Sequence, residues 1–218
     1  MDEVLLPEIL PEQAVVIANG LFPDHPIPLE ILQKSNFNIY CDGAAKRSHL
    51  DKYAPDIIIG DLDSIQKDVY DKYREIIVRV ETQDTSDLEK ALLWCNKYSI
   101  KSVVILGASG LREDHLISNI FLLESYCQDF DHISMITNYG SFSPVYSEKI
   151  FESFLGQQVS IFCIDATVKI TSEHLMYPLN KTSLNGLNKG ISNESTSTSF
   201  TISLSHGVVV IFTSHGVK

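Results

Sequence analysis

Several features of common protein classes are missing from this chain of 218 residues. Positive charge is scarce, because 17 Lys and Arg stand against 28 Asp and Glu and the formal net charge is -11. Such acidity argues against a general surface for nucleic acid or for anionic membranes. It leaves room for a nucleotide, since a divalent cation and a few basic side chains can offset the charge of its phosphates. We therefore expect no nucleic-acid partner.

Targeting, membrane and disulfide signals are lacking as well. The N-terminal Met1–Leu5 carries no basic residue and no long apolar core follows it, unlike a signal peptide. No apolar run reaches the length of about 20 residues that spans a membrane. The four cysteines are far apart and form no CxxC pair, so neither structural zinc nor a disulfide framework is expected. We expect a cytoplasmic protein with reduced, buried thiols and no membrane partner.

The first part of the chain alternates strand and helix patterns. Short apolar runs predict strands, and amphipathic stretches between them predict helices. This alternation indicates a mainly parallel, layered α/β domain, which we place at residues 1–140. The predicted strands are Ala14–Asn19, Phe37–Cys41, Asp56–Ile59, Ile76–Val80, Ser102–Leu106 and Ile133–Thr137, and the predicted helices are Pro28–Lys34, Ala44–Leu50, Ile65–Arg74, Ser86–Tyr98 and Asp114–Cys127.

Residues 141–218 have a different character. Short apolar or alternating runs are separated by Gly, Asn, Ser and Thr, and no helical period is evident. This pattern predicts a small all-β domain, for which we expect a β-sandwich. Ser205–Gly207 predicts a tight turn of the kind that joins two strands of a hairpin. The predicted strands are Val159–Ile164, Val168–Thr171, Phe200–Leu204 and Val208–Thr213.

The segment Gly60–Ser64 is the most informative in the chain. It follows the apolar run Asp56–Ile59, which reads as a buried strand, and it contains Asp61 and Asp63. In extended backbone, alternate side chains point the same way, so both carboxylates should aim at one point beyond the strand. Two carboxylates this close need a cation, and oxygen ligands favour Mg²⁺. Unless the pair is only a solvated turn, it predicts a Mg²⁺ site for substrate phosphates.

Three further segments bring acid or glycine to the ends of other predicted elements: Cys41–Ala45, Gln83–Ala91 and Gly107–His115. In the second of these, Ser86 has Glu89 three residues later, which is the pattern of a capping box at a helix start. Asp87 then falls in the first helical turn, where the helix dipole favours an anion. One acid pair alone would be weak evidence, but four such segments in one α/β region indicate a shared site at the carboxyl ends of the strands.

The four segments resemble, in order and in spacing, the motifs of the thiamine pyrophosphokinase family. The family patterns run roughly DGGAN, GDFDS, QDxTDxxKA and GxxGGRxDH. The resemblance implies transfer of the pyrophosphoryl group of ATP to the hydroxyl of thiamine, giving thiamine diphosphate and AMP. It also implies dependence on Mg²⁺ and a homodimer, in which thiamine lies between the α/β domain of one subunit and the β-sandwich domain (141–218) of its partner.

The resemblance also assigns residues. Asp42, Asp61, Asp63 and Asp87 are the expected catalytic residues. Of these, Asp61, Asp63 and Asp87 are the expected metal ligands, and Asp42 is a further ligand or the group that orients or deprotonates the thiamine hydroxyl. The residues expected to bind ATP or thiamine are Gln83, Asp84, Ser86, Lys90, Arg112, Asp114, Ser192 and Asn193.

The chain departs from the family pattern at Ala44, Ser86 and Leu111. Ser86 stands where Thr is usual and keeps the hydroxyl. Leu111 is the larger departure, because it replaces a glycine in a loop where close backbone approach to phosphate would favour glycine.

Several roles have two interpretations. Lys90 either pairs with Asp87 or reaches a phosphate. The planar fork of Arg112 suits phosphate oxygens, although a surface salt bridge with Glu113 or Asp114 is the alternative. Asp114 either binds near the metal or caps the following helix.

The sequence gives less evidence for the residues that contact the thiamine ring. Ser192 and Asn193 resemble a family segment near the pyrimidine, or are an ordinary polar loop. Some relatives stack an aromatic side chain on the vitamin, and Phe200 is the expected substitute because the C-terminal part has no Trp. Trp94 is expected in the core or a dimer interface, and His115 is expected to be packed at a helix start.

Two other functions compete with the kinase. A phosphatase could use Asp61 as the nucleophile of a DxD motif, but such motifs usually follow the first strand, and this one follows the third predicted strand. A catalytically weak sensor of thiamine or nucleotide is the second alternative. The full set of acids argues against it.

Overall fold

The computed structural model describes residues 10–216. Its contacts divide the chain into two compact units. The first contains the residues up to 122 together with 128–138, and the second contains 123–127 and the residues from 139 onward. Among the described residues, no helix has both the length and the apolar character needed to cross a membrane.

The first unit is built on a parallel sheet. In spatial order its strands are β6 (His132–Ile136), β5 (Ser102–Leu106), β1 (Gln13–Ile17), β2 (Asn38–Cys41), β3 (Ile57–Gly60) and β4 (Ile77–Arg79). Every adjacent pair runs parallel. The strand order changes direction between β1 and β5, which is the place where open α/β sheets bind ligands.

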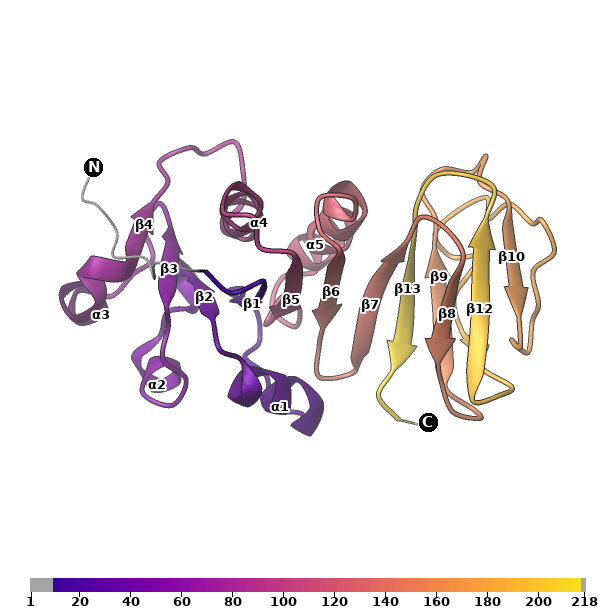
Figure 1. Ribbon diagram of the computed structural model, residues 1–218, viewed down its shortest axis with the longest axis horizontal. Coiled ribbons are helices and arrows are strands. Elements are labelled where there is room, and N and C mark those ends of the chain that lie inside the picture. Colours follow the sequence, from indigo (N-terminus) through magenta and orange to yellow (C-terminus); the bar gives the residue numbers. More distant parts are fainter. Residues whose placement is uncertain (1–9, 217–218) are drawn as a thin grey trace. The chain divides into compact units, whose positions relative to one another are not determined.

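Helices cover this sheet on two sides. Figure 1 shows α4 on the opposite side of the strands from α1 and α2. The helices are α1 (Pro26–Lys34), α2 (Arg47–Leu50), α3 (Lys67–Tyr73), α4 (Asp87–Lys97) and α5 (Glu113–Tyr126), with short 3-10 turns η1 (Asp42–Ala44) and η2 (Arg74–Ile76). The layered α/β prediction is therefore confirmed, and each of its six predicted strands is present.

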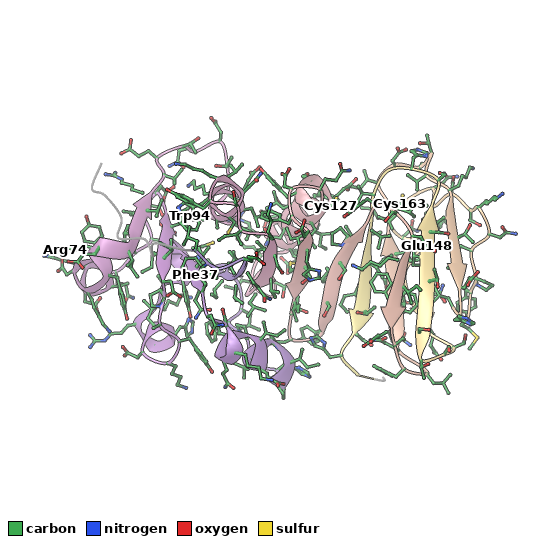
Figure 2. The ribbon with its side chains drawn as sticks, viewed as in Figure 1. Phe37, Arg74, Trp94, Cys127, Glu148 and Cys163 are labelled. Carbon is green, nitrogen blue, oxygen red and sulfur yellow. The ribbon has the colours of Figure 1, made fainter. Side chains whose placement is uncertain are left out.

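Trp94 belongs to the core of the first unit. It lies on α4, and its ring centroid is 6.3 Å from that of Phe37, just before β2 (Figure 2). Tyr98, one helical turn later, packs against it at a tilt, with ring centroids 4.5 Å apart. This aromatic row fixes α4 to the sheet, so the helix start at Ser86 is held close to the strand ends.

The second unit is a β-sandwich, as predicted. One antiparallel sheet has the order β11 (Asn193–Glu194), β9 (Gln158–Phe162), β13 (Val209–Ser214) and β7 (Gly140–Val145), and the other has the order β10 (Ile170–Glu173), β12 (Ser199–Leu204) and β8 (Lys149–Glu152). Side chains of both sheets, such as Ile161, Phe200, Ile202 and Ile211, share one hydrophobic core.

Ser205–Gly207 forms the predicted turn between β12 and β13, but the two strands it joins do not form a hairpin. Strand β12 pairs with β10 and β8, whereas β13 pairs with β7 and β9. The main chain of Ser205 bonds instead to Lys169, which precedes β10. The turn crosses between sheets because the inward residues of the two strands face each other across the core. Strands β7, β8 and β11 were not predicted, since each is short or interrupted by polar residues.

Candidate active site

The carboxyl edge of the first sheet gathers three acids. Asp42 begins the 3-10 turn directly after β2, and Asp61 and Asp63 follow β3. One carboxylate oxygen from each lies within 4.8 Å of those of the other two. We call Asp42, Asp61 and Asp63 the acidic cluster. The convergence of Asp61 and Asp63 follows the prediction, and Asp42 joins them from the neighbouring strand.

The backbone that brings these acids together is not extended. Leu62 has a φ of 73°, in the left-handed region that leucine rarely adopts. Its N–H donates to Asp42 Oδ2 at 2.8 Å, and the N–H of Asp63 donates to Asp61 Oδ1 at 3.2 Å. The expected alternation along extended backbone is therefore wrong, because the loop turns and its acids converge through hydrogen bonds.

Gly60 makes the space that Asp42 occupies. A Cβ atom added at Gly60 would lie 2.5 Å from Asp42 Cγ, closer than any real contact of that kind. A side chain at this position would displace the carboxylate. The glycine at the end of β3 is thus required by the acid at the end of β2.

Asp42 is a buried carboxyl, with 1% of its surface exposed. Burial raises its pKa to about 6, and the charge of Asp87 and a hydrogen bond with it act in the same direction. The N–H groups of Leu62 and Gly43 oppose this shift. A cation beside Asp42 would offset both the burial and the repulsion.

Lys90 provides positive charge inside the site. Its side chain is 2% exposed, and its ammonium lies 2.9 Å from Asp87 Oδ1 and 3.4 Å from Asp61 Oδ2. Burial disfavours the charged amine, but the bonds and charges of Asp87 and Asp61 outweigh it, so the pKa of Lys90 lies above its usual value. Of the two interpretations from the sequence, the structure contains the pairing with Asp87.

In the segment before α4, Gln83 contacts Asp61 and Ser86 caps the helix. Gln83 Nε2 donates to Asp61 Oδ2 at 3.1 Å. The pKa of Asp61 is lowered, first by the N–H of Asp63 and then by Gln83 and Lys90. Ser86 Oγ accepts from the Glu89 N–H at 3.2 Å, so Ser86 caps α4. Asp84 is exposed at the loop surface.

A hard cation fits this cluster. Three carboxylates supply oxygen ligands, and one of them is buried with a raised pKa. The loop also contains Thr85 Oγ1, a buried hydroxyl oxygen without a hydrogen-bond partner. Such an orphan costs folding energy unless a ligand or water bonds to it. Its signal was missed in the sequence, because a Thr in a polar loop looks ordinary.

Arg112 and Asp114 lie beyond β5 and bond to each other. Arg112 Nε lies 3.1 Å from Asp114 Oδ1 and Nη2 lies 2.5 Å from Oδ2. Both side chains are exposed, so this surface ion pair contributes little to stability. His115 is exposed, and the prediction that it is packed is wrong.

In the second unit, Asn193 is used for structure. Its Oδ1 accepts from the Tyr177 N–H at 3.0 Å, and its Nδ2 donates to the Tyr177 carbonyl at 2.8 Å. Ser192, which precedes it, is exposed and has a φ of 61°. The structure thus holds Tyr177 beside the Ser192–Asn193 segment, with 68% of the tyrosine exposed.

Phe200 cannot stack on a ligand. None of its surface is exposed, and its ring stacks on Phe151 with centroids 4.9 Å apart. Phe200 was expected at the site because it is aromatic, but the alternation of β12 turns that ring into the sandwich core.

An acidic cluster at the carboxyl edge of a parallel α/β sheet is typical of enzymes that hold phosphates through a divalent cation. The family comparison is more specific. Residues 29–136 match the catalytic domain of thiamin pyrophosphokinase, and residues 140–212 match the substrate-binding domain of thiamin pyrophosphokinase. The chain belongs to the thiamin pyrophosphokinase family.

Curated relatives match the chain over a limited segment. Thiamine pyrophosphokinase 1 of Arabidopsis thaliana is 35% identical over 85 residues, which are 34% of this chain and 32% of that protein. Thiamin pyrophosphokinase 1 of Caenorhabditis elegans is 32% identical over 97 residues, 40% of this chain and 39% of that protein. These matches span between a third and two fifths of the relatives' length.

Solved structures match over nearly the whole chain. Thiamine pyrophosphokinase from Bacillus subtilis has a TM-score of 0.78 at 23% identity, covering 93% of this chain and 98% of that one. Thiamin pyrophosphokinase from Candida albicans has a TM-score of 0.76 at 18% identity, covering 98% and 95%. At these identities the likeness establishes the fold.

Proposed function

We propose that this protein is a thiamine diphosphokinase, which transfers the pyrophosphoryl group of ATP to thiamine. The observation that carries the proposal is the acidic cluster, within a chain of this family. The thiamine hydroxyl oxygen bonds to the β-phosphorus of ATP, and the bond from that phosphorus to the α,β-bridging oxygen breaks. AMP leaves with the bridging oxygen, and the hydroxyl proton passes to a carboxylate of the cluster. Thiamine diphosphate is the second product.

Asp61 and Asp63 are the proposed ligands of Mg²⁺, with Asp42 as the third. When bound, the ion neutralises charge on the transferred phosphates and holds them for in-line attack. Asp87 was predicted as a ligand, and its bonds to Lys90 and Asp42 support a different assignment. We assign Asp87 to the positioning of Asp42 and of Lys90.

Arg112 is the proposed phosphate ligand on the β5 side. Its guanidinium already forms a two-pronged bond with a carboxylate, and phosphate oxygens match the same geometry. In the absence of ATP, Asp114 holds the Arg112 guanidinium through these bonds. Gln83 and Asp84 lie on the β4 side, where Gln83 orients Asp61.

The β-sandwich, residues 141–218, is the proposed thiamine-binding and dimerisation domain, and the partner in the dimer is a second copy of the chain. Ser192 lies at this site, and Asn193 holds its loop. Tyr177 is the proposed aromatic partner of the thiamine ring, because it is exposed and fixed by Asn193. Free, buried cysteines are compatible with the proposed cytoplasmic location.

The test is the formation of AMP and thiamine diphosphate from ATP, Mg²⁺ and thiamine. Asp61→Asn and Asp63→Asn are expected to lower kcat/KM at least about a hundredfold, since even indirect partners of a metal ligand contribute about 10- to 100-fold. Asp165→Asn is the matched control, because Asp165 is an exposed aspartate that bonds to Thr167 in the second unit. It should leave turnover unchanged.

The products decide between the candidate reactions. ADP with thiamine monophosphate would mean attack on the γ-phosphorus and would refute pyrophosphoryl transfer. Thiamine binding without any turnover would favour a sensor. A phosphorylated Asp61 would favour the phosphatase.

A further inference from the structure

Two leucines are exposed beside the proposed phosphate ligand. Leu111, directly before Arg112, is 59% exposed, and Leu21, which follows β1, is 44% exposed. Leu21 packs against Gly110, since a Cβ added at Gly110 would lie 2.8 Å from Leu21 Cβ. We call Leu21 and Leu111 the apolar shelf. Large exposed aliphatic side chains on a ligand-binding edge suggest contact with an apolar part of the ligand.

The loops that carry the shelf are fixed. The Gly20 N–H donates to the Gly107 carbonyl at 2.6 Å, and the Leu21 N–H donates to the Ser109 carbonyl at 2.7 Å. Asn119, a buried residue of α5, donates through Nδ2 to the Ala108 carbonyl at 2.9 Å. These bonds connect the segments after β1 and β5, so the shelf is formed before any ligand binds.

The shelf lies where the strand order changes direction. The acids are carried by β2 and β3, on one side of β1, and Leu111 follows β5 on the other side. A donor that reaches from the acidic cluster to Arg112 would therefore extend toward the shelf. The opposite direction passes beyond β4, where Glu81 and Asp84 are exposed.

Charge favours the same direction. The charged half of a nucleoside triphosphate requires the cation and Arg112, whereas its nucleoside is uncharged. The shelf adds no charge, and leucine side chains offer apolar area for the face of a base. Beyond β4 the exposed side chains of Glu81 and Asp84 are charged, so they offer a base little apolar area.

We propose that the apolar shelf binds the base of the donor nucleotide, and that Leu111 sets the weak selectivity of this enzyme among purine nucleotides. This inference rests on the proposed function. Leucine side chains have no hydrogen-bonding groups, so they contact a purine face without reading its edge. Apolar contacts of this kind discriminate weakly between molecules of similar size. Mg-ATP and Mg-GTP should therefore bind with affinities within about tenfold of each other.

The experiment measures equilibrium binding of Mg-ATP, Mg-GTP and Mg-triphosphate by calorimetry, with no thiamine present. Leu111→Ala and Leu21→Ala should each weaken both nucleotides by about threefold to tenfold, the loss expected from removing part of an apolar contact. Binding of triphosphate, which has no base, should stay unchanged. Ile117→Ala is the matched control, because Ile117 is an exposed aliphatic residue on α5. It should change none of the three.

Three results would overturn the proposal. Equal weakening of triphosphate would mean that Leu111 shapes the phosphate loop. Unchanged binding of all three ligands would place the base elsewhere. Conversion of a dimer to a monomer by Leu111→Ala, measured by light scattering, would make the shelf an interface between copies. The proposed function is tested separately, by turnover of the unaltered protein.

Discussion

The two units differ in how they use buried polar side chains. The first unit buries two ionisable side chains, Asp42 and Lys90, in addition to neutral ones such as Asn119. In the second unit, the buried polar residues are Gln157, Ser172, Asn193 and Ser195. These are neutral, and their side chains bond to the main chain of loops or of a strand end.

This contrast separates two kinds of polar burial. A buried charge is costly unless it is paired, and it is retained where it holds other groups for a ligand. A buried amide or hydroxyl that bonds to the main chain fixes a loop at lower cost. The α/β unit therefore uses buried ionisable groups to hold its candidate site, whereas the sandwich uses buried neutral groups to fix its main chain.

The largest effect should come from Lys90→Met. It leaves Asp87 and Asp61 without their buried partner, so the free energy of unfolding should fall by about 3 to 5 kcal/mol. Lys149→Met is the control from the sandwich, where burial lowers the pKa of the lysine. That change should be neutral or stabilising. Urea unfolding of the first unit can be followed through the fluorescence of Trp94, the single tryptophan, and unfolding of the sandwich through circular dichroism. Equal effects of both changes would break the comparison.

Asp42→Asn should stabilise the protein in the absence of divalent cations. The pKa of Asp42 is raised to about 6 in the folded protein, so folding favours the protonated carboxyl. This contribution to stability is fully present below the pKa that Asp42 has in the unfolded chain, and it is lost as the pH rises through 6. The variant should match the parent at pH 4 and exceed it by about 2 kcal/mol at pH 7.

Unfolding between pH 4 and 7.5, with a chelator, tests this expectation. Added Mg²⁺ should stabilise the parent more than the variant, because the variant has lost one proposed ligand. A difference that does not change with pH would contradict the raised pKa.

Asn193→Ala should lower the free energy of unfolding of the sandwich by about 1 to 2 kcal/mol, because the main chain of Tyr177 loses its partners. The KM for thiamine should rise with little change in kcat, since the loop is displaced and the acids are not. Circular dichroism and steady-state kinetics give both values. Asn185→Ala, at an exposed position, is the control. A fall in kcat alone would contradict a loop-holding role.

The smallest effect should come from Ser86→Ala, which removes the cap of α4 and costs about 1 kcal/mol. Ser86→Thr keeps a capping hydroxyl and should restore most of this stability. Thermal unfolding followed by Trp94 fluorescence measures both. If Ser86→Thr restores stability without restoring activity, Ser86 contacts a ligand as well as capping the helix.

The sequence predicts the first unit well. Continuous apolar runs such as Ile57–Ile59 mark strands that are buried on both faces, and such runs resemble few other elements. The convergence of Asp61 and Asp63 was also predictable, but it results from a turn at Leu62 and not from the extended backbone that the prediction assumed. The left-handed Leu62 depends on a bond to Asp42 from another strand, and local patterns contain no sign of it.

The second unit was harder to predict because its strands are short and each has one exposed face. The chain alternates between sheets, so neighbours in sequence such as β12 and β13 are not neighbours in a sheet. Phe200 and Tyr177 are both aromatic, but Phe200 is buried by the register of β12, whereas Tyr177 lies in a bend outside the strands and is exposed. Site residues in such a unit follow from tertiary structure.

Lys90 has a consequence for how the chain matures. The ammonium group of Lys90 pairs with Asp61 and Asp87, so it offsets part of their negative charge. The loops that carry the acids can therefore fold without a bound cation. Folding and the proposed binding of Mg²⁺ are therefore separate events, so a chelator should abolish the proposed turnover and leave a folded protein that regains it when Mg²⁺ is added.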